Sequence, residues 1–240
     1  MSIQDHYDKL LARHYTWMCG DYDTKVSEFT AFFKNHGIVP NGSGKALDLG
    51  CGSGFQSVAL AGLGFDVLSI DTSAELLREL RGGAEGKLVT TMHGDMRNTE
   101  LYAPHAPFEV AVCMGDSLTL LASFEEVESL LKVLHDCLEP GGKLVLGFRD
   151  LSLELTGVNR VLPVRSDDEK IMTVFLEYEA EHVNVHDLFY LRENGAWTLH
   201  KSAYKKLRVS AERTIASLRQ LGFQNVSHEM ERGFSTIIAQ

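Results

Sequence analysis

The sequence predicts an α/β protein with a doubly wound, mostly parallel seven-stranded sheet into which a small antiparallel sheet is inserted. The first observation is that apolar strands, expected near 45–50, 66–70, 88–93, 108–114 and 142–148, alternate with helical stretches near 54–63, 73–82 and 123–138. Such alternation is typical of parallel sheets. The second is a period-two pattern from about Ile171 to Leu207, broken by the turn ENGA at 193–196. Asn-Gly tolerates positive φ and favours a tight hairpin.

The remaining segments complete this organisation. We expect an amino-terminal helical segment over 1–44, with one or two helices in 3–36 and a turn-rich linker at Pro40–Gly44. The core spans 45–150 and the antiparallel insertion 151–208. A carboxy-terminal part, 209–240, holds a helix near 210–221 and two closing strands near 223–239.

Three local signals refine the element boundaries. Capping boxes at Thr72-x-x-Glu75 and Ser123-x-x-Glu126 predict two helix starts, because each supplies side-chain partners for unpaired N–H groups. The tetrapeptide EPGG at 139–142 predicts a stop before the fifth strand.

Composition bounds the function. The chain has 240 residues and a formal net charge of −10, which disfavours nucleic acid and anionic membranes as partners. Four cysteines form no C-x-x-C pair, so we expect reduced thiols and a cytoplasmic protein. No run approaches membrane-spanning length, and the histidines show no metal-ligand spacing, so no metal is predicted. The sequence leaves a homo-oligomer open.

The octapeptide LDLGCGSG at 47–54 is the segment that points most directly to a ligand-binding function. A strand that enters glycines and then a helix lets the backbone approach a ligand and aims N–H groups at it. Asp71, at the tip of the next strand, can accept hydrogen bonds from both hydroxyls of a ribose. Dinucleotide binders read G-x-G-x-x-G, but Phe55 occupies the third glycine position here. A glycine-rich turn in some other α/β protein is the alternative.

The pattern D-x-G-x-G-x-G resembles motif I of the class I S-adenosylmethionine-dependent methyltransferases, which have a Rossmann-like fold. The resemblance implies S-adenosyl-L-methionine as cofactor, bound by the core 45–150. It implies that Asp48 helps to anchor the cofactor's ammonium. Asp95 in HGDMR could accept from the adenine amino group and Met96 pack on the ring, although Asp is also a favoured helix N-cap.

Three further segments narrow the resemblance to the glycine and sarcosine N-methyltransferases. MGDSLTLL at 114–121 is similar to the family's segment after the fourth strand, and GFRDLSLELTG at 147–157 to its segment after the fifth. YTWMCGDYDTKVSEF at 15–29 resembles the amino-terminal cofactor lid. The inserted sheet is similar in placement and would cover the acceptor site.

This narrower resemblance implies roles for acceptor residues. Arg149 would grip an amino acid's carboxylate through its planar fork, and Asp116 stands where the family has the Asn that holds the acceptor nitrogen. Lys25 stands in place of a lid arginine that meets the cofactor carboxylate. A surface ion pair for Arg149 and a helix cap for Asp116 are the alternatives. The implied cofactor contacts as a set are Tyr15, Lys25, Asp48, Gly50, Cys51, Gly52, Asp71, Thr72, Asp95, Met96, Met114 and Ser117.

The sequence therefore predicts a methyltransferase acting on a small-molecule acceptor, an amine or an amino-acid-like compound. The segment DSLTLL is not of the N-P-P-Y type found in enzymes that methylate DNA or protein glutamine, which favours a small acceptor. A non-catalytic protein that binds S-adenosylmethionine or S-adenosylhomocysteine is the first alternative, and a dinucleotide-dependent oxidoreductase is the second.

Overall fold

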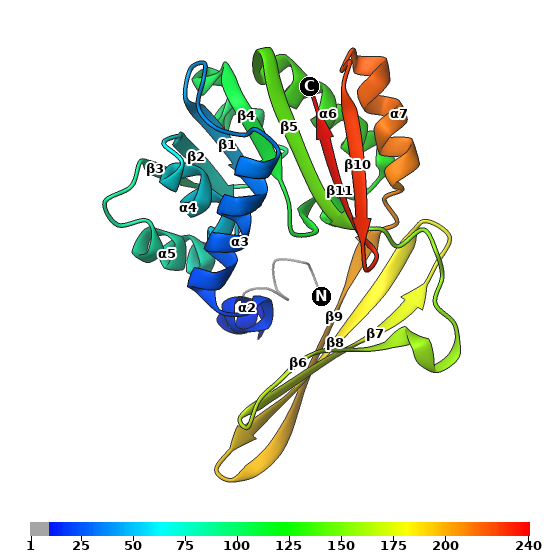
Figure 1. Cartoon of the computed structure of the whole chain (residues 1–240). Helices are drawn as coiled ribbons and strands as arrows, with labels where there is room; N and C mark the ends of the chain where they lie inside the picture. The colour runs from blue at the N-terminus through cyan, green and yellow to red at the C-terminus, as the bar shows by residue number, and fades with distance from the viewer. Residues whose placement is uncertain (1–9) are drawn as a thin grey trace.

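The computed structural model describes residues 10–240. Two sheets form its framework: a seven-stranded sheet in the order β10-β11-β5-β4-β1-β2-β3 and a four-stranded sheet in the order β6-β7-β8-β9. Figure 1 shows the small sheet extending from the edge of the large sheet at which the parallel strands end. The predicted fold class is confirmed.

The large sheet is parallel except at one side. Its parallel strands are β1 (Lys45–Leu49), β2 (Asp66–Asp71), β3 (Val89–His93), β4 (Phe108–Cys113) and β5 (Leu138–Arg149). Strand β11 (Phe234–Ala239) pairs antiparallel with β5, and β10 (Val226–Glu231) pairs antiparallel with β11. The central strands are buried on both faces, which explains their continuous apolar runs.

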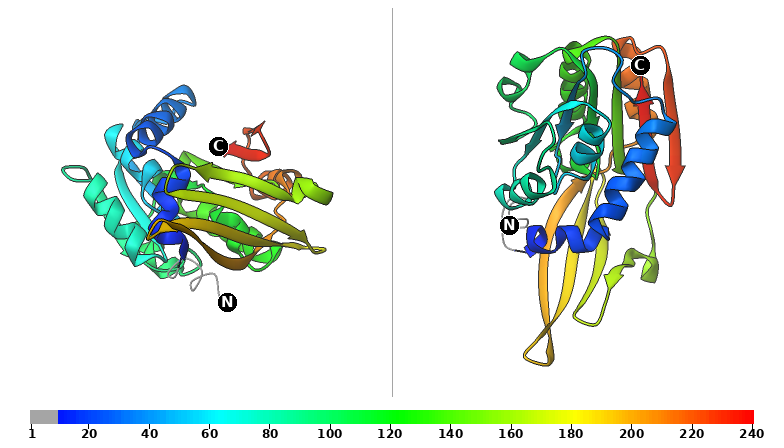
Figure 2. Two further views of the ribbon diagram at one scale, coloured as in Figure 1. Left: turned by 90° about the horizontal axis from the view of Figure 1, so that it is seen from below. Right: turned by 60° about the vertical axis from the view of Figure 1, so that its left-hand side comes forward.

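Helices cover both faces of this sheet (Figures 1 and 2). One face carries α3 (Tyr22–Asn35), α4 (Phe55–Gly62) and α5 (Ala74–Gly83). The other carries α6 (Phe124–Cys137) and α7 (Ala211–Leu221), which bury their apolar stripes in the largest core cluster. Short 3-10 turns, η2 (Thr99–Leu101), η3 (Ala103–His105), η4 (Ser117–Leu120) and η5 (Gly157–Arg160), connect the elements.

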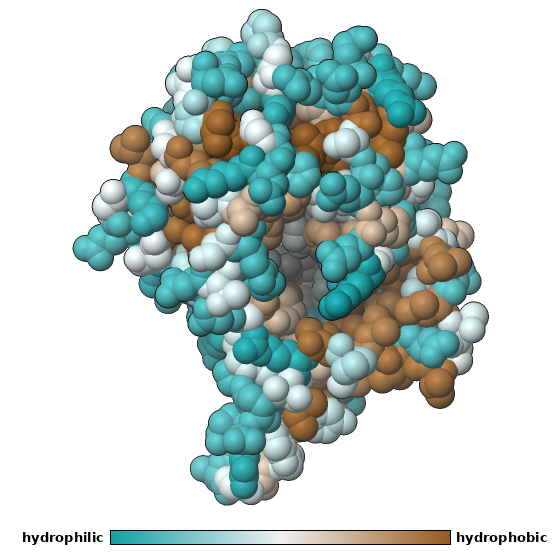
Figure 3. Space-filling view, in the orientation of Figure 1, coloured by the Kyte–Doolittle hydropathy of each residue, from teal (hydrophilic) through white to brown (hydrophobic). Residues whose placement is uncertain are grey.

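The inserted sheet consists of β6 (Val161–Ser166), β7 (Lys170–Tyr178), β8 (His182–Glu193) and β9 (Ala196–Leu207), all antiparallel. The predicted hairpin turn is confirmed: Glu193 pairs with Ala196, and Asn194 and Gly195 have φ of 51° and 82°. Helix α2 (Ala12–Cys19) packs on one face of this sheet, where Trp17 approaches Phe189. Exposed apolar side chains gather at β6 and the segment before it (Figure 3), namely Leu153, Val158, Val161 and Val164.

Two local predictions need correction. Helix α5 is capped by Ser73, whose Oγ accepts from the Leu76 N–H at 3.3 Å, and not by Thr72. The stop predicted at 139–142 is instead the beginning of β5, where the pairing with β4 shifts register. Gly142 allows this bulge, because a Cβ there would lie 2.9 Å from the carbonyl oxygen of Glu139.

The second capping prediction is half right. Ser123 caps α6, because its Oγ accepts from the Glu126 N–H at 3.4 Å. The Glu126 carboxylate does not return to Ser123, and accepts from the Ala122 N–H at 3.2 Å.

A substitution at Leu134 tests the packing of the core between α6 and the large sheet. Its side chain is 1% exposed among β4, β5 and α7 residues, so Leu134→Ala should lower the free energy of unfolding by about 2–5 kcal/mol. Leu199→Ala, at a position 43% exposed, should change it by less than about 0.5 kcal/mol. Urea titration of both variants measures the difference, and equal losses would contradict the assignment of the core.

Candidate functional site

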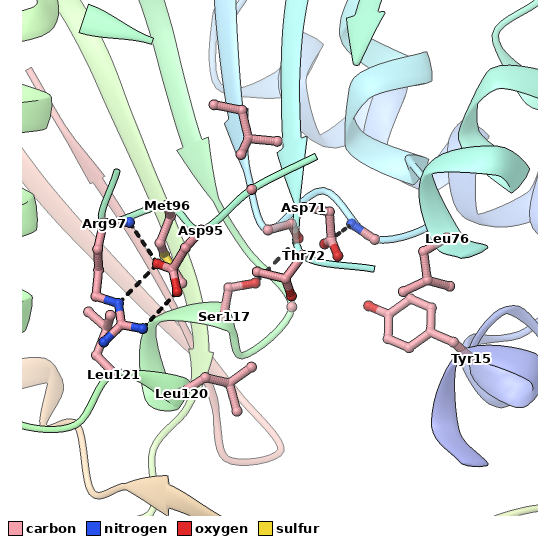
Figure 4. A pocket seen from close by; sticks show the side chains of 15 residues that line it. Tyr15, Asp71, Thr72, Leu76, Asp95, Met96, Arg97, Ser117, Leu120 and Leu121 are labelled. Carbon is pink, nitrogen blue, oxygen red and sulfur yellow. Dashed lines mark hydrogen bonds and ion pairs between the residues drawn. The ribbon is translucent and has the colours of Figure 1, made fainter. Parts of the chain in front are cut away.

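A cavity of about 300 Å³ lies where β1, β2 and β4 end. This is the edge at which open α/β sheets bind ligands. Figure 4 shows side chains from the loops after these strands and from α2 converging on it. It is lined by Tyr15, Gly50, Gly52, Ile70, Asp71, Thr72, Leu76, Gly94, Asp95, Met96, Arg97, Gly115, Ser117, Leu120 and Leu121.

The glycine loop after β1 forms one wall. It is fixed to β2 by the N–H groups of Gly50 and Cys51, which donate to the Ile70 carbonyl at 2.8 and 3.1 Å. Gly50 has φ of +68°, and a Cβ there would lie 2.2 Å from Ser117 Oγ. Gly54 has φ of +88°, and its Cβ would lie 2.1 Å from Leu80 Cδ1. Only glycine therefore lets the loop run between its neighbours and lead into α4.

Asp71 connects this loop to α5. Its Oδ2 accepts from the Gly52 N–H at 2.8 Å and its Oδ1 from the Ser73 N–H at 2.8 Å. Burial raises the pKa of the Asp71 carboxyl, and the hydrogen bonds from Ser73 and Gly52 partly oppose that shift. An ionised carboxylate has about four acceptor positions, so the bonds from Gly52 and Ser73 do not use all of them.

Asp95 and Met96 line the far end of the cavity, after β3. The Asp95 carboxylate is held by Arg97, whose Nε and Nη2 donate to its two oxygens at 2.9 and 2.7 Å. The hydrogen bonds from Arg97 lower the pKa of Asp95. Asp95 therefore caps no regular helix, and its carboxylate stays ionised at this end of the cavity.

Tyr15 and Ser117 lie near the glycine loop. The ring of Tyr15 would be 3.1 Å from a Cβ placed on Gly52, so α2 brings this ring close to the loop. Ser117 Oγ donates to the carbonyls of Gly50 and Met114 at 3.3 and 3.2 Å. The loop after β4 is thereby attached to the loop after β1.

Three residues predicted to contact the cofactor lie inside the core instead of along the cavity. Cys51 and Met114 are 3% and 5% exposed. Asp48 is 1% exposed, and its carboxylate accepts from Ser57 Oγ at 2.6 Å, which in turn accepts from Ser69 Oγ at 2.8 Å. This hydrogen-bonded chain holds β1, α4 and β2 together directly behind the glycine loop.

The structure also keeps the predicted acceptor residues out of the cavity lining. Asp116 accepts from the backbone N–H of Arg149 and from Lys206 Nζ at 2.6 Å. Burial disfavours its charged form, but Lys206 and Arg149 together outweigh burial and lower the pKa of Asp116. The Arg149 guanidinium is exposed and donates to the Arg232 carbonyl at 3.4 Å. Lys25, predicted to contact the cofactor, is also absent from the lining and pairs with Glu28 at 2.6 Å.

Eight of the sequence-predicted residues therefore line one cavity: Tyr15, Gly50, Gly52, Asp71, Thr72, Asp95, Met96 and Ser117. Sequence reasoning missed Arg97, although it follows Asp95 in the motif HGDMR, and missed Leu120 and Leu121 in the segment after the fourth strand. It also missed Lys206, because no sequence signal links a strand of the insertion to Asp116.

Within residues 10–240, no group of three or more His, Cys, Asp or Glu side chains could hold a metal ion. No helix in the described part of the chain is long and apolar enough to cross a membrane.

Comparison with known proteins gives the class. Residues 46–142 match the family model of a methyltransferase domain. Glycine/sarcosine N-methyltransferases from Halorhodospira halochloris and Aphanothece halophytica are 31% and 33% identical over 134 and 131 residues. Each alignment covers 54% of this chain and 48% of the relative, so the chain spans about half the length of these curated relatives.

A solved structure agrees in fold. CalS10, an amino pentose methyltransferase from Micromonospora echinaspora, superposes with a TM-score of 0.74 at 17% identity, covering 95% of this chain and 94% of that one. The chain therefore has the α/β fold of this methyltransferase. The match of residues 46–142 and the similarity to these relatives support a class I S-adenosylmethionine-dependent methyltransferase.

Asp71→Ala tests the predicted ribose contact. The variant loses the acceptor for a diol and the bonds to Gly52 and Ser73, so affinity for S-adenosylhomocysteine should fall by about 10- to 150-fold. Asp66→Ala, at the exposed start of the same strand, is the matched control and should leave affinity unchanged. Isothermal calorimetry measures both, and an unchanged dissociation constant for Asp71→Ala would refute the assignment.

Asp48 predicts a pH dependence of stability. Burial raises its pKa to about 7, whereas an unfolded Asp titrates near about 3.9. The native state then holds this proton more tightly, so ionisation lowers the free energy of unfolding progressively as pH rises from about 4 to about 7. Asp48→Asn keeps an acceptor for Ser57 and lacks this loss. Its free energy of unfolding should therefore rise relative to that of the wild type across this window, by about 1.4 kcal/mol for each pH unit.

Urea midpoints at pH 4, 5.5 and 7 measure this difference. Asp66→Asn, on the exposed end of β2, should show none. A difference between Asp48→Asn and the wild type that stays constant over the three pH values would show that Asp48 titrates normally.

Proposed function

We propose that the protein transfers a methyl group from S-adenosyl-L-methionine to a small-molecule acceptor, an amine or an amino-acid-like compound. One observation carries the proposal. A single cavity contains, in order, the glycine loop with Tyr15, the carboxylate of Asp71, and the pair Asp95–Met96. A methionine moiety, a ribose and an adenine follow one another in the same order along the cofactor.

The residues present fit each part of this cofactor. Gly50 and Gly52 offer close backbone approach to the amino-acid end, because neither carries a side chain. Asp71 lines the cavity with an acceptor carboxylate suited to ribose hydroxyls. Met96 lines the cavity with an apolar side chain suited to an aromatic face, beside an ionised Asp95. The bound cofactor supplies an already activated methyl on a sulfonium.

The chain's own contribution is then alignment and exclusion of water. Helix α2 joins two parts of the structure: Thr16 donates to Glu79 of α5, and the Trp17 indole N–H donates to Asp167 between β6 and β7. The cation Lys170 lies 5.5 Å from the centre of the Trp17 ring. These contacts support a role for α2 as a cover over the glycine loop, and desolvation of this kind strengthens the electrostatic interactions of the bound reactants.

Charge and relatives support a nitrogen acceptor. The net charge of −10 favours cationic or neutral ligands over anionic polymers. The relatives are named as N-methyltransferases of glycine and sarcosine, and the structural neighbour as an amino pentose methyltransferase. Asp116 stays ionised beside the loop after β4 in its ion pair with Lys206, and its contact with the acceptor stays a prediction. A carboxylate grip by Arg149 remains a prediction, and its exposed guanidinium offers it no support.

The same properties bear on location and partners. The four cysteines, Cys19, Cys51, Cys113 and Cys137, are free thiols. We infer a reducing, cytoplasmic environment and no nucleic-acid partner, supported by these thiols and by the acidic net charge.

Label transfer tests the proposed activity. The purified protein, incubated with methyl-labelled S-adenosylmethionine and pools of amines, amino acids and phenols, should label an amine or amino-acid pool. Gly50→Ala, whose Cβ would meet Ser117 Oγ, should abolish transfer. Transfer confined to phenols would contradict the nitrogen acceptor. Binding of S-adenosylhomocysteine without transfer to any pool would favour a non-catalytic binding protein.

A further inference from the structure

Arg97 binds the carboxylate of Asp95 at the end of the cavity that follows β3. Asp95 Oδ1 accepts from the Arg97 backbone N–H at 2.8 Å and from its Nε at 2.9 Å, while Oδ2 accepts from Nη2 at 2.7 Å. Figure 4 shows the guanidinium beside this carboxylate, next to Leu121. A carboxylate has about four acceptor positions. Three are taken by Arg97, so one position, on Oδ2, remains for a ligand.

The guanidinium is itself held from a second element. Arg97 Nη1 lies 3.5 Å from Glu126 Oε2, and that oxygen also accepts from the Ala122 N–H at the start of α6. The side chain of Arg97 is 54% exposed, so its removal takes little from the core. Its contacts join the loop after β3 to α6 and set the direction in which Asp95 faces.

Because Arg97 keeps the Asp95 carboxyl ionised, this group can accept hydrogen bonds but cannot donate one. An Arg fork fixes a planar carboxylate bidentately and favours its charged form. A purine with a 6-amino group brings an N–H to the remaining lone pair of Oδ2. A purine with a 6-oxo group brings a lone pair to the same place, where two acceptors repel and neither is satisfied.

We propose that Arg97 is the positioning residue that makes the site selective for a 6-aminopurine cofactor over its 6-oxo counterpart. The inference rests on the proposed function, because it requires the nucleobase to lie at Asp95. It assigns to Arg97 a role in selectivity and not in binding alone. Two of the three bonds from Arg97 to Asp95 come from its guanidinium, and these are the bonds that a side-chain substitution removes.

The test compares two ligands that differ at one ring position, S-adenosylhomocysteine and S-inosylhomocysteine. Calorimetry gives the ratio of their dissociation constants for the wild type and for Arg97→Met, which keeps the aliphatic stem and loses the fork. In the variant Asp95 can turn away or be protonated, so the ratio should fall by tenfold or more.

Two further variants sharpen the result. Arg97→Lys keeps the charge without the fork, and its ratio should fall between those of the wild type and Arg97→Met. Arg81→Met removes an exposed arginine of α5 that donates to Thr91 at 2.8 Å and should leave the ratio unchanged. Melting temperatures within a degree or two of the wild type would show that all three variants fold.

The outcomes separate this inference from the proposed function. If the wild type binds S-adenosylhomocysteine and Arg97→Met weakens both ligands equally, the ratio is unchanged and the inference is overturned while the proposed function stands. If the wild type binds neither ligand, the proposed function fails and the inference fails with it. A selective loss of discrimination in Arg97→Met, with Arg81→Met unaffected, establishes the role.

Discussion

The carboxylate of Asp71 is the interaction on which the cavity depends. Its two oxygens accept from the Gly52 N–H in the loop after β1 and from the Ser73 N–H at the start of α5. Charge-assisted bonds of this kind are about twice as strong as neutral ones, and here they act at a group that burial disfavours in its charged form. The group predicted to bind a ribose is therefore also the group that shapes the glycine loop, so loop order and ligand binding are coupled through one side chain.

Most of the fold follows from local sequence patterns. The apolar runs that predicted β1, β2 and β4 are continuous because these strands are buried on both faces, and Asn194-Gly195 predicted its hairpin because positive φ is a property of those residues themselves. The errors occur where two local signals compete. Thr and Ser both cap helices readily, so the sequence alone does not say which of the adjacent Thr72 and Ser73 is the cap of α5. The pairing of 138–143 with β4 was likewise not visible in the glycines of 139–142.

In the candidate site, too, local sequence patterns predict some residues and miss those whose place depends on long-range contacts. Asp71 and Asp95 could be predicted because each follows a strand, and the ends of parallel strands meet at one edge. The burial of Asp48 could not, because the hydrogen-bonded chain through Ser57 and Ser69 depends on which way each side chain points. The contact between Lys206 and Asp116 joins residues 90 positions apart, and it gives a predicted acceptor residue an ion-pair partner within the chain. Long-range pairs of this kind leave no periodic trace in a sequence.

The ion pair between Asp116 and Lys206 also connects the inserted sheet to the loops that line the cavity. Asp116 has φ of +75°, and its carboxylate holds β9 through Lys206 and the end of β5 through the Arg149 N–H. The next residue, Ser117, donates to the Gly50 carbonyl in the glycine loop. A shift of the inserted sheet would therefore move the loop after β4 and, through Ser117, the cofactor wall of the cavity. The insertion can change its sequence to suit an acceptor while this short chain of contacts keeps it aligned with the cofactor.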